Sequence, residues 1–80
     1  MKVKILCFAG LRDFFPSQQE IELENIITVS EFKNFMVSNN PNAKEIIRIS
    51  RVSLNQIIVN DSDKIQDGAI IAILPPSSGG

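Results

Sequence analysis

Two glycines and two prolines near the end of the printed sequence are the residues with the clearest chemical potential. Because glycine has no Cβ, Gly79 and Gly80 fit a narrow channel and leave the terminal carboxyl carbon open to attack. Pro75 and Pro76 cannot donate to a β-ladder, so they should end the last strand and begin the tail as a stiff lead. This order suits a carboxylate that one enzyme activates and another uses. The alternative is an ordinary frayed end, since a two-residue motif is weak evidence alone.

Cys7 is the only cysteine and suggests a second kind of sulfur chemistry, a persulfide on its side chain. It shares its parity in a predicted strand with Val3 and Ile5, so we expect it to be buried. Burial raises the pKa of a thiol and keeps it unreactive, and we therefore interpret Cys7 as a core residue. One cysteine and no histidine exclude a zinc site and a disulfide framework. An unpaired cysteine without a secretory signal fits a reducing cytoplasm.

The composition bounds the remaining functions. Eighty residues make one domain, and no apolar run is long enough to span a bilayer. Eight basic and nine acidic side chains give a net charge of −1, and the basic residues are scattered along the sequence. We therefore predict a cytoplasmic protein that binds neither nucleic acid nor membranes. Glu20, Glu22 and Glu24 alternate with apolar residues, which is typical of the solvated face of a strand.

Alternating and continuous apolar segments predict four strands. They cover residues 2–9, 19–25, 52–59 and 69–74. The loop between the first two suggests a hairpin, and turns are predicted at residues 60–63 and at Asp67-Gly68. The last segment is apolar throughout, so it needs a central place in the sheet or cover on both faces.

One principal helix is predicted from a capping box, in which the Thr28 hydroxyl binds the amide of Glu31 and the Glu31 carboxylate reaches back. Four apolar residues then recur at helical spacing: Val29, Phe32, Phe35 and Met36. The helix should end at residues 39–41. A second, shorter helix is predicted within residues 42–50. The residues that it should bury are Ile46, Ile47 and Ile49.

These elements predict an α+β fold, in which one main helix and a short second helix pack on a mixed sheet of four to five strands. The first and last strands should lie side by side at the centre, which explains both apolar segments together. We interpret the pattern as a β-grasp, ubiquitin-like domain over residues 1–76, followed by a flexible tail at residues 77–80. The tail would then leave from the centre of the sheet.

Three segments match the pattern of a known family. They are residues 3–12 (VKILCFAGLR), 54–60 (LNQIIVN) and 65–80 (IQDGAIIAILPPSSGG). On these segments the sequence resembles the small, sulfur-carrying subunits of molybdopterin synthase. The last segment is the most specific, because an Asp-Gly turn, an apolar strand, Pro-Pro and a terminal Gly-Gly coincide at the right spacing. Two features depart from the family pattern: Ala69-Ile70 stands where acidic residues are common, and Ser77 stands where valine is common.

The resemblance implies a carrier cycle. An ATP-dependent, E1-like enzyme adenylates Gly80, and sulfur from a separate donor displaces AMP to leave a thiocarboxylate. The carrier then docks on the large subunit of the synthase, in a heterotetramer of two small and two large subunits, and inserts its tail, with Gly79, into the active site. Sulfur passes to cyclic pyranopterin monophosphate and builds the dithiolene of the molybdenum cofactor. In this scheme the chain itself binds no cofactor or metal and has no active site of its own, since the acid, the base and the ATP site belong to the partners.

Strand parity predicts an apolar patch on the sheet face that the helix leaves open, and such a patch commonly marks a protein interface. Its predicted members are Leu6, Phe8, Leu54, Ile58 and Leu74. The resemblance implies contacts with the large subunit from four residues: Phe8, Arg12, Ile58 and Leu74. Pro75 and Pro76 complete the predicted binding residues as the lead into the tail. The alternative is that Phe8 and Leu74 are core residues.

Three other functions share these features. A sulfur carrier for thiamine synthesis has the same fold and terminal Gly-Gly, although that family is usually shorter and lacks the Pro-Pro pair. A ubiquitin-like modifier would use the same activation but end in an isopeptide bond to a lysine of another protein. A plain interaction module would have a tail without function.

Overall fold

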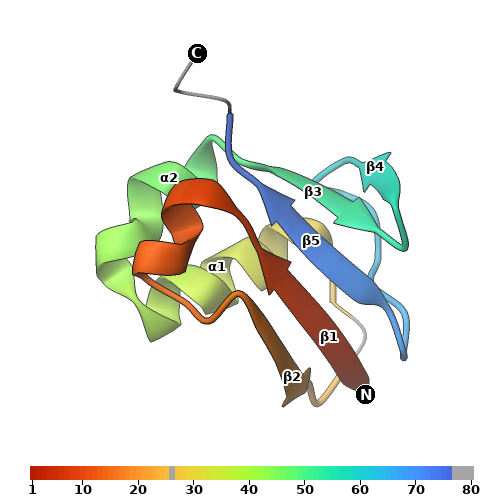
Figure 1. Ribbon diagram of the computed structural model, residues 1–80. Coiled ribbons are helices and arrows are strands. Elements are labelled where there is room, and N and C mark those ends of the chain that lie inside the picture. The colour runs from red at the N-terminus through yellow and green to blue at the C-terminus, as the bar shows by residue number, and fades with distance from the viewer. Residues whose placement is uncertain (26, 77–80) are drawn as a thin grey trace.

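The computed structural model describes residues 1–25 and 27–76, which form a layer of sheet and a layer of helices (Figure 1). The strands are β1 (Lys2–Cys7), β2 (Gln18–Glu22), β3 (Arg51–Leu54), β4 (Ile57–Val59) and β5 (Ile70–Leu74). The helices are α1 (Val29–Asn39) and α2 (Lys44–Arg48), with short 3-10 helices η1 (Ala9–Asp13) and η2 (Pro41–Ala43). The predicted tail at residues 77–80 lies outside the described residues.

The sheet has the order β2-β1-β5-β3-β4, with β1 and β5 parallel and the other neighbouring strands antiparallel. The first and last strands therefore lie side by side, and β5 is the central strand, as its apolar sequence predicts. The predicted hairpin of β1 and β2 is also present. Figure 1 shows β5 between β1 and β3. A mixed sheet in this order with one principal helix against it is the predicted β-grasp arrangement.

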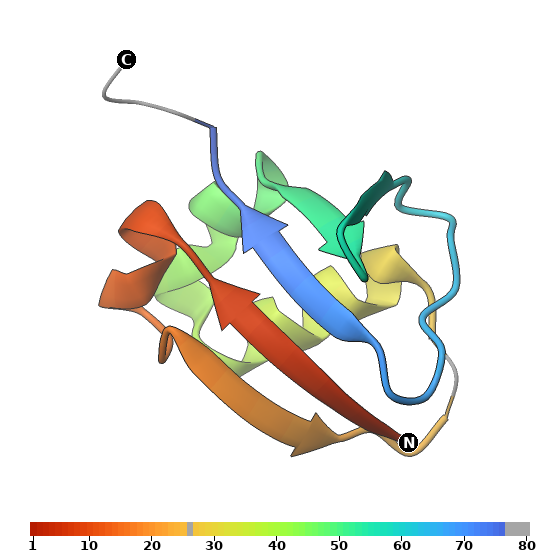
Figure 2. The ribbon, with the colours of Figure 1, turned by 45° about the vertical axis from the view of Figure 1, so that its right-hand side comes forward.

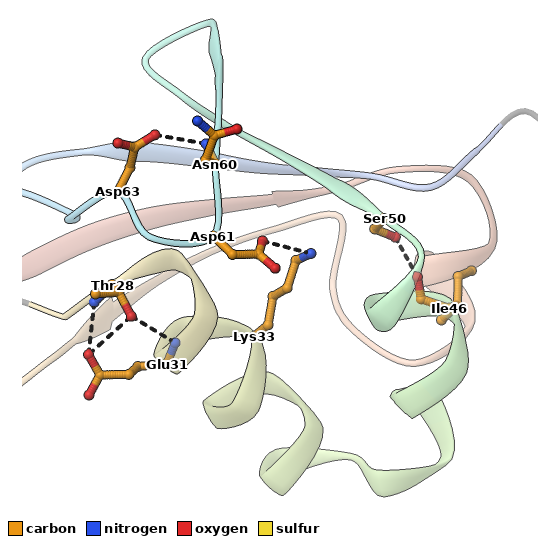
Figure 3. A network of polar contacts seen from close by, with 8 residues as sticks. All are labelled: Thr28, Glu31, Lys33, Ile46, Ser50, Asn60, Asp61 and Asp63. Carbon is orange, nitrogen blue, oxygen red and sulfur yellow. Dashed lines mark hydrogen bonds and ion pairs between the residues drawn. The ribbon is translucent and has the colours of Figure 1, made fainter.

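Helix α1 begins at the predicted capping box. The Glu31 amide donates to Thr28 Oγ1 at 3.2 Å, and the Thr28 amide donates to Glu31 Oε1 at 3.1 Å. Two further first-turn amides donate to the carbonyls of Asp61 and Asp63, both at 2.9 Å. Figure 3 shows this end of the helix beside the turn that follows β4. The cap and the turn together satisfy amides that a helix start leaves without partners, and they fix α1 against the sheet.

The core lies between the sheet and the helices. The largest fully buried side chains include Phe32, Ile5, Leu11, Met36, Ile47, Ile65, Ile71 and Ile73. Burial of each stabilises the fold by roughly 1.5–3 kcal/mol relative to exposure. Figure 2 shows α1 crossing behind the sheet. The helices therefore cover one face of the sheet and leave the other open.

The segment 52–59 consists of two strands, although one was predicted. A two-residue turn at Asn55 and Gln56 joins β3 to β4, and the φ angles of these residues are 52° and 73°. Positive φ at both central residues gives the turn whose twist fits a hairpin. The turn is also tied to the central strand, because the Asn55 amide donates to the Ile70 carbonyl and the Ile70 amide donates to Asn55 Oδ1, both at 2.9 Å. The prediction was wrong because the usual signal for this turn has glycine at the second position, where this chain has glutamine.

The expected burial of Ile49 was also wrong, since this side chain is 51% exposed. Helix α2 ends at Arg48, after only five residues. Ile47 faces the core, whereas Ile46 and Ile49, about one turn apart, both line a groove beside the end of β5. The predicted second helix is therefore present but shorter than predicted. Its residue Ile46 lines the groove that also contains Pro75 and Pro76.

Candidate functional site

The tail begins at the centre of the sheet. Strand β5 ends at Leu74, and Pro75 and Pro76 follow outside the ladder, as predicted for residues that cannot donate to it. We call these three residues the tail root. Because β5 is paired with β1 on one side and β3 on the other, the tail root continues from the strand that the sheet holds most firmly. The predicted reactive residues, Gly79 and Gly80, lie outside the described residues.

A small groove borders the tail root on the side of the helices. Its volume is about 110 Å³, and its lining consists of Ala9, Gly10, Ile46, Ile49, Pro75 and Pro76. A Cβ at position 10 would lie 3.0 Å from Ile46 Cδ1, so a larger residue there would have to displace the end of this isoleucine side chain. Ala9 has a φ of 51°, in the left-handed region that is costly for a residue with a side chain. The tail root thus leaves the sheet between η1 and the end of α2.

Ser50 fixes the end of α2 that borders this groove. Its buried hydroxyl donates to the Ile46 carbonyl, as Figure 3 shows, and its amide donates to the Ile47 carbonyl at 3.1 Å. These bonds satisfy carbonyls that the end of a helix leaves without partners. Ser50 therefore fixes the backbone at the end of α2, including that of Ile46, which lines the groove. Sequence reasoning missed this role, because a serine after a helix does not by itself indicate a cap at that end.

The open face of the sheet carries an apolar patch beside the tail root. We define this open-face patch as Leu6, Phe8, Ile58, Ile70 and Leu74. Ile58 is 51% exposed and Phe8 is 37% exposed. The exposure of Phe8 contradicts the alternative in which this side chain belongs to the core. Between the larger side chains lie Ala72 and Ser53, which are opposite each other in the β3–β5 ladder and buried. Small residues at the centre and larger ones around them make a shallow apolar surface.

The membership of this patch differs from the prediction at two residues. Leu54 was expected on the open face, but it pairs with Ile71 and Ile57 and packs against the core. In a single strand Leu54 and Ile58 would share a face, whereas the turn between them reverses this relation. Ile70 was not predicted, although it shares its parity in β5 with Leu74 and is 43% exposed. That parity was the signal that would have identified it.

Arg12 lies at the edge of the open-face patch, in η1. Its guanidinium carbon is 6.0 Å from the centre of the Phe8 ring, and its Nε donates to the Cys7 carbonyl at 3.4 Å. A cation at this distance over an aromatic face is weakly attracted to it. The side chain is exposed, so its remaining N–H donors face solvent beside the Phe8 ring. Arg12 is therefore placed where a rim residue of an interface would be.

The Cys7 side chain is buried in the core, as predicted. Desolvation by burial raises the pKa of its thiol from the ordinary value of 9.0. Less thiolate is therefore present at neutral pH, and the surrounding core blocks access to the sulfur. These two properties oppose a role for Cys7 as a persulfide carrier.

The buried polar side chains of the described residues are hydrogen-bonded within the fold. Every buried side-chain nitrogen or oxygen in residues 1–25 and 27–76 has a hydrogen-bond partner. Lys33 pairs with Asp61 at 3.2 Å, close to the α1 cap (Figure 3). In the part of the chain that the structure describes, no group of acidic or cysteine side chains is arranged to hold a metal ion. No helix in these residues combines the length and the apolar character needed to cross a membrane.

Comparison with known proteins gives a family match over nearly all of the chain. The sequence profile of the ThiS family matches residues 5–80. A relative from Chlamydomonas reinhardtii, the molybdopterin synthase sulfur carrier subunit, is 30% identical over 83 residues, and the match covers all of both chains.

The fold is shared with solved structures, and two of them serve as examples. One is a Pyrococcus furiosus protein assigned as subunit 1 of molybdopterin converting factor, with a TM-score of 0.81, 23% identity and coverage of 94% of this chain and 97% of that chain. The other is a complex of subunits 1 and 2 of molybdopterin-converting factor from Helicobacter pylori, with a TM-score of 0.71, 22% identity and complete coverage of both chains. At these identities the likeness concerns the fold alone.

Proposed function

Because this chain belongs to the ThiS family, we propose that it is the sulfur-carrier subunit of a molybdopterin synthase. The relative with that name matches it from end to end. The structural observation that carries the proposal is the tail root, which continues from the central strand and is bordered by the open-face patch. A partner that binds this patch is therefore correctly placed to receive the residues that follow Pro76.

The proposed chemistry takes place at the carboxylate of Gly80. A carboxylate is a poor electrophile, so it first attacks the α-phosphate of ATP, which releases pyrophosphate and forms an acyl adenylate. A sulfur nucleophile supplied by a donor then attacks the carboxyl carbon and displaces AMP, and a thiocarboxylate remains. The thiocarboxylate sulfur finally passes to cyclic pyranopterin monophosphate in the active site of the large subunit, and water attacks the acyl carbon to restore the Gly80 carboxylate. In this cycle ATP is a substrate of the activating enzyme.

The residues of this chain position the reactive end for enzymes that supply the catalytic groups. Gly79 and Gly80 have no side chains, so the tail fits a narrow channel. Pro75 and Pro76 limit the directions in which the tail can leave the sheet, because their φ angles are fixed by the ring. The ordered root reduces the conformational entropy that is lost when the tail enters an active site.

The proposed docking surface for the large subunit is the open-face patch with Arg12 at its edge. Phe8 and Ile58 are large, exposed and apolar. Phe8 follows the pair Cys7–Ile73 beside Leu74 of the tail root, whereas Ile58 lies on the edge strand β4, opposite Ser53. An interface with an apolar centre and a charged rim is the usual arrangement in protein complexes. Docking through this face would present the tail to the partner in a fixed orientation.

Intact-mass spectrometry tests the proposed chemistry. The chain is incubated with the activating enzyme, ATP and a sulfur donor, and the product is fragmented to locate any change. We expect exchange of one oxygen for sulfur at Gly80, and no exchange when ATP is left out. Sulfur located on Cys7, or an isopeptide bond from Gly80 to a lysine of another protein, would contradict the proposal.

A further inference from the structure

At the end of the sheet away from the tail root, the basic side chains on the open face lie opposite acidic residues in the ladder. Lys2 lies opposite Glu22 and Lys4 lies opposite Glu20 in the β1–β2 ladder. Residues directly opposite each other on antiparallel strands project on the same face, with Cβ atoms about 5 Å apart. The two lysines therefore each lie beside a carboxylate, and Glu22 also pairs with the N-terminal ammonium at 3.2 Å. This end of the open face, far from the tail root, carries charges of both signs.

The other end of the open face, where the tail begins, has basic side chains without acidic neighbours in the ladder. Arg51 lies opposite Leu74 in the β3–β5 ladder, and Arg12 lies over the Phe8 ring. No ion pair among the described residues involves Arg12 or Arg51, and the ladder places apolar Leu74 rather than an acid opposite Arg51. Both arginines are exposed. Two positive charges thus flank apolar side chains in a chain whose net charge is −1.

The sheet places these two charges on opposite sides of the tail root. Phe8 and Leu74 each follow the last parallel pair of β1 and β5, Cys7 and Ile73, and Arg51 is the partner of Leu74 on the far side. The row across the end of the sheet is therefore Phe8 with Arg12, then Leu74, then Arg51. Neighbouring strands are about 4.8 Å apart, so the backbones of β1 and β3 are separated by about 10 Å. The tail root leaves the sheet between them.

We propose that Arg12 and Arg51 form a two-point clamp that binds carboxylates of the large synthase subunit on either side of the entrance to its active site. This inference rests on the proposed function, and Arg51 is the residue that it adds. A guanidinium binds a carboxylate with two parallel hydrogen bonds, which fixes orientation as well as distance. Two such contacts, one on each side of the tail root, would set the angle at which the tail enters the active site of the large subunit.

The large subunit is the expected occupant because the clamp is continuous with the open-face patch. Leu74 belongs both to the patch and to the row between the arginines, so a partner seated on the patch also meets Arg51. Charged residues at the rim of an interface act mainly on the rate of association and on the choice of partner. Arg51 therefore selects a partner with matching acidic residues, while the apolar centre provides the contact area.

Charge reversal at Arg51 tests this inference. Binding of the full-length chain to the isolated large subunit is measured by calorimetry at about 0.05 M and about 0.5 M salt, because screening separates charge effects from apolar ones. The variants are Arg51→Glu and Arg51→Lys. The control is Lys44→Glu, which changes the net charge by the same amount on α2, within the helix layer. Sulfur loading of Gly80 is followed in parallel by mass spectrometry.

We expect Arg51→Glu to weaken binding about tenfold at low salt, with a smaller loss at high salt, and Arg51→Lys to lose less. Lys44→Glu should bind like the unmodified chain. Equal binding by Arg51→Glu and Lys44→Glu at low salt would overturn the clamp and leave the proposed function intact. The same conclusion would follow if Arg51→Glu slowed sulfur loading by the activating enzyme without weakening binding to the large subunit. If the unmodified chain loads no sulfur and does not bind the large subunit, the proposed function fails and the clamp fails with it.

Discussion

Gly10 in η1 lies directly against Ile46 in α2, at a distance where a Cβ on Gly10 would be 3.0 Å from Ile46 Cδ1. This approach brings the end of β1 and the end of α2 together on one side of the tail root. Both residues line the groove that also contains Pro75 and Pro76. A contact between two residues of different elements therefore forms part of the groove beside Pro75 and Pro76.

Substitution of Gly10 by alanine should destabilise the fold by about 1 kcal/mol, because the added methyl overpacks the contact with Ile46. Ile46→Val removes the Cδ1 methyl and should itself cost about 1 kcal/mol. In the double variant the added and removed methyl groups compensate. Its loss of stability should therefore be smaller than the sum of the losses in the two single variants. Urea unfolding of the four proteins measures this coupling. Strictly additive losses would show that the two side chains do not compete for the same space.

Substitution of Gln56 by glycine should stabilise the protein by about 0.5–1 kcal/mol, because Gln56 has a φ of 73° and glycine adopts positive φ without strain. Asn-Gly is also the preferred pair in this kind of hairpin turn. Thermal unfolding measures the effect. Gln66→Gly serves as the control, since Gln66 is exposed and is not among the residues with positive φ, and this variant should be destabilised. A loss of stability in both variants would contradict the hairpin assignment.

Substitution of Phe8 by aspartate should weaken binding to the large subunit by roughly 2 kcal/mol, or about thirtyfold. The fold should tolerate this change, because the Phe8 side chain is 37% exposed. Ile57→Asp is the matched control, since Ile57 is an exposed apolar residue outside the open-face patch. Binding is measured by calorimetry and folding by thermal melting. An unfolded Phe8→Asp variant would mean that Phe8 is a core residue after all.

The buried thiol of Cys7 makes part of the stability depend on pH. Its pKa is raised by burial above 9.0, so at alkaline pH the folded protein holds this proton more tightly than the unfolded chain. The stability that the protonated thiol contributes to the folded state is present in full below the ordinary pKa. It is lost as the pH rises through the raised pKa. Cys7→Ala lacks this group and leaves a small cavity. The difference in the free energy of unfolding between the two proteins should therefore narrow from about pH 8 to about pH 10.

Val3→Ala is the control for this measurement, because it truncates another buried side chain of β1 that does not titrate. The difference in the free energy of unfolding between Val3→Ala and the unmodified protein should stay constant over the same pH range. A constant difference for Cys7→Ala as well would show that the thiol ionises equally in the folded and unfolded states.

Local signals predicted the fold where neighbouring residues decide the structure. The capping box from Thr28 to Glu31 sets the start of α1, and the prolines after Leu74 set the end of β5. The uniformly apolar last segment indicated its central place in the sheet. The β3–β4 hairpin was not predictable in the same way, because Asn55-Gln56 adopts positive φ without the glycine that usually marks such a turn.

The candidate site was predicted only in part, because its composition depends on strand register. Phe8, Ile58 and Leu74 follow from parity within each strand, and they lie on the open face as expected. Leu54 does not, because its face depends on the turn that was missed. The position of Arg51 beside the tail root depends on the pairing of β3 with β5, which strand patterns alone do not fix. Arg12 and Arg51, which are far apart in the sequence, flank the tail root only because of this strand order.

The central claim is that the protein acts through the free carboxylate at Gly80, and a chain that ends in a carboxamide tests this claim most directly. The two forms are compared in an assay that contains the large subunit, the activating enzyme, ATP, a sulfur donor and cyclic pyranopterin monophosphate. We predict that the amide form binds the large subunit as tightly as the carboxylate form and yields no dithiolene product. Equal product from both forms would contradict the account.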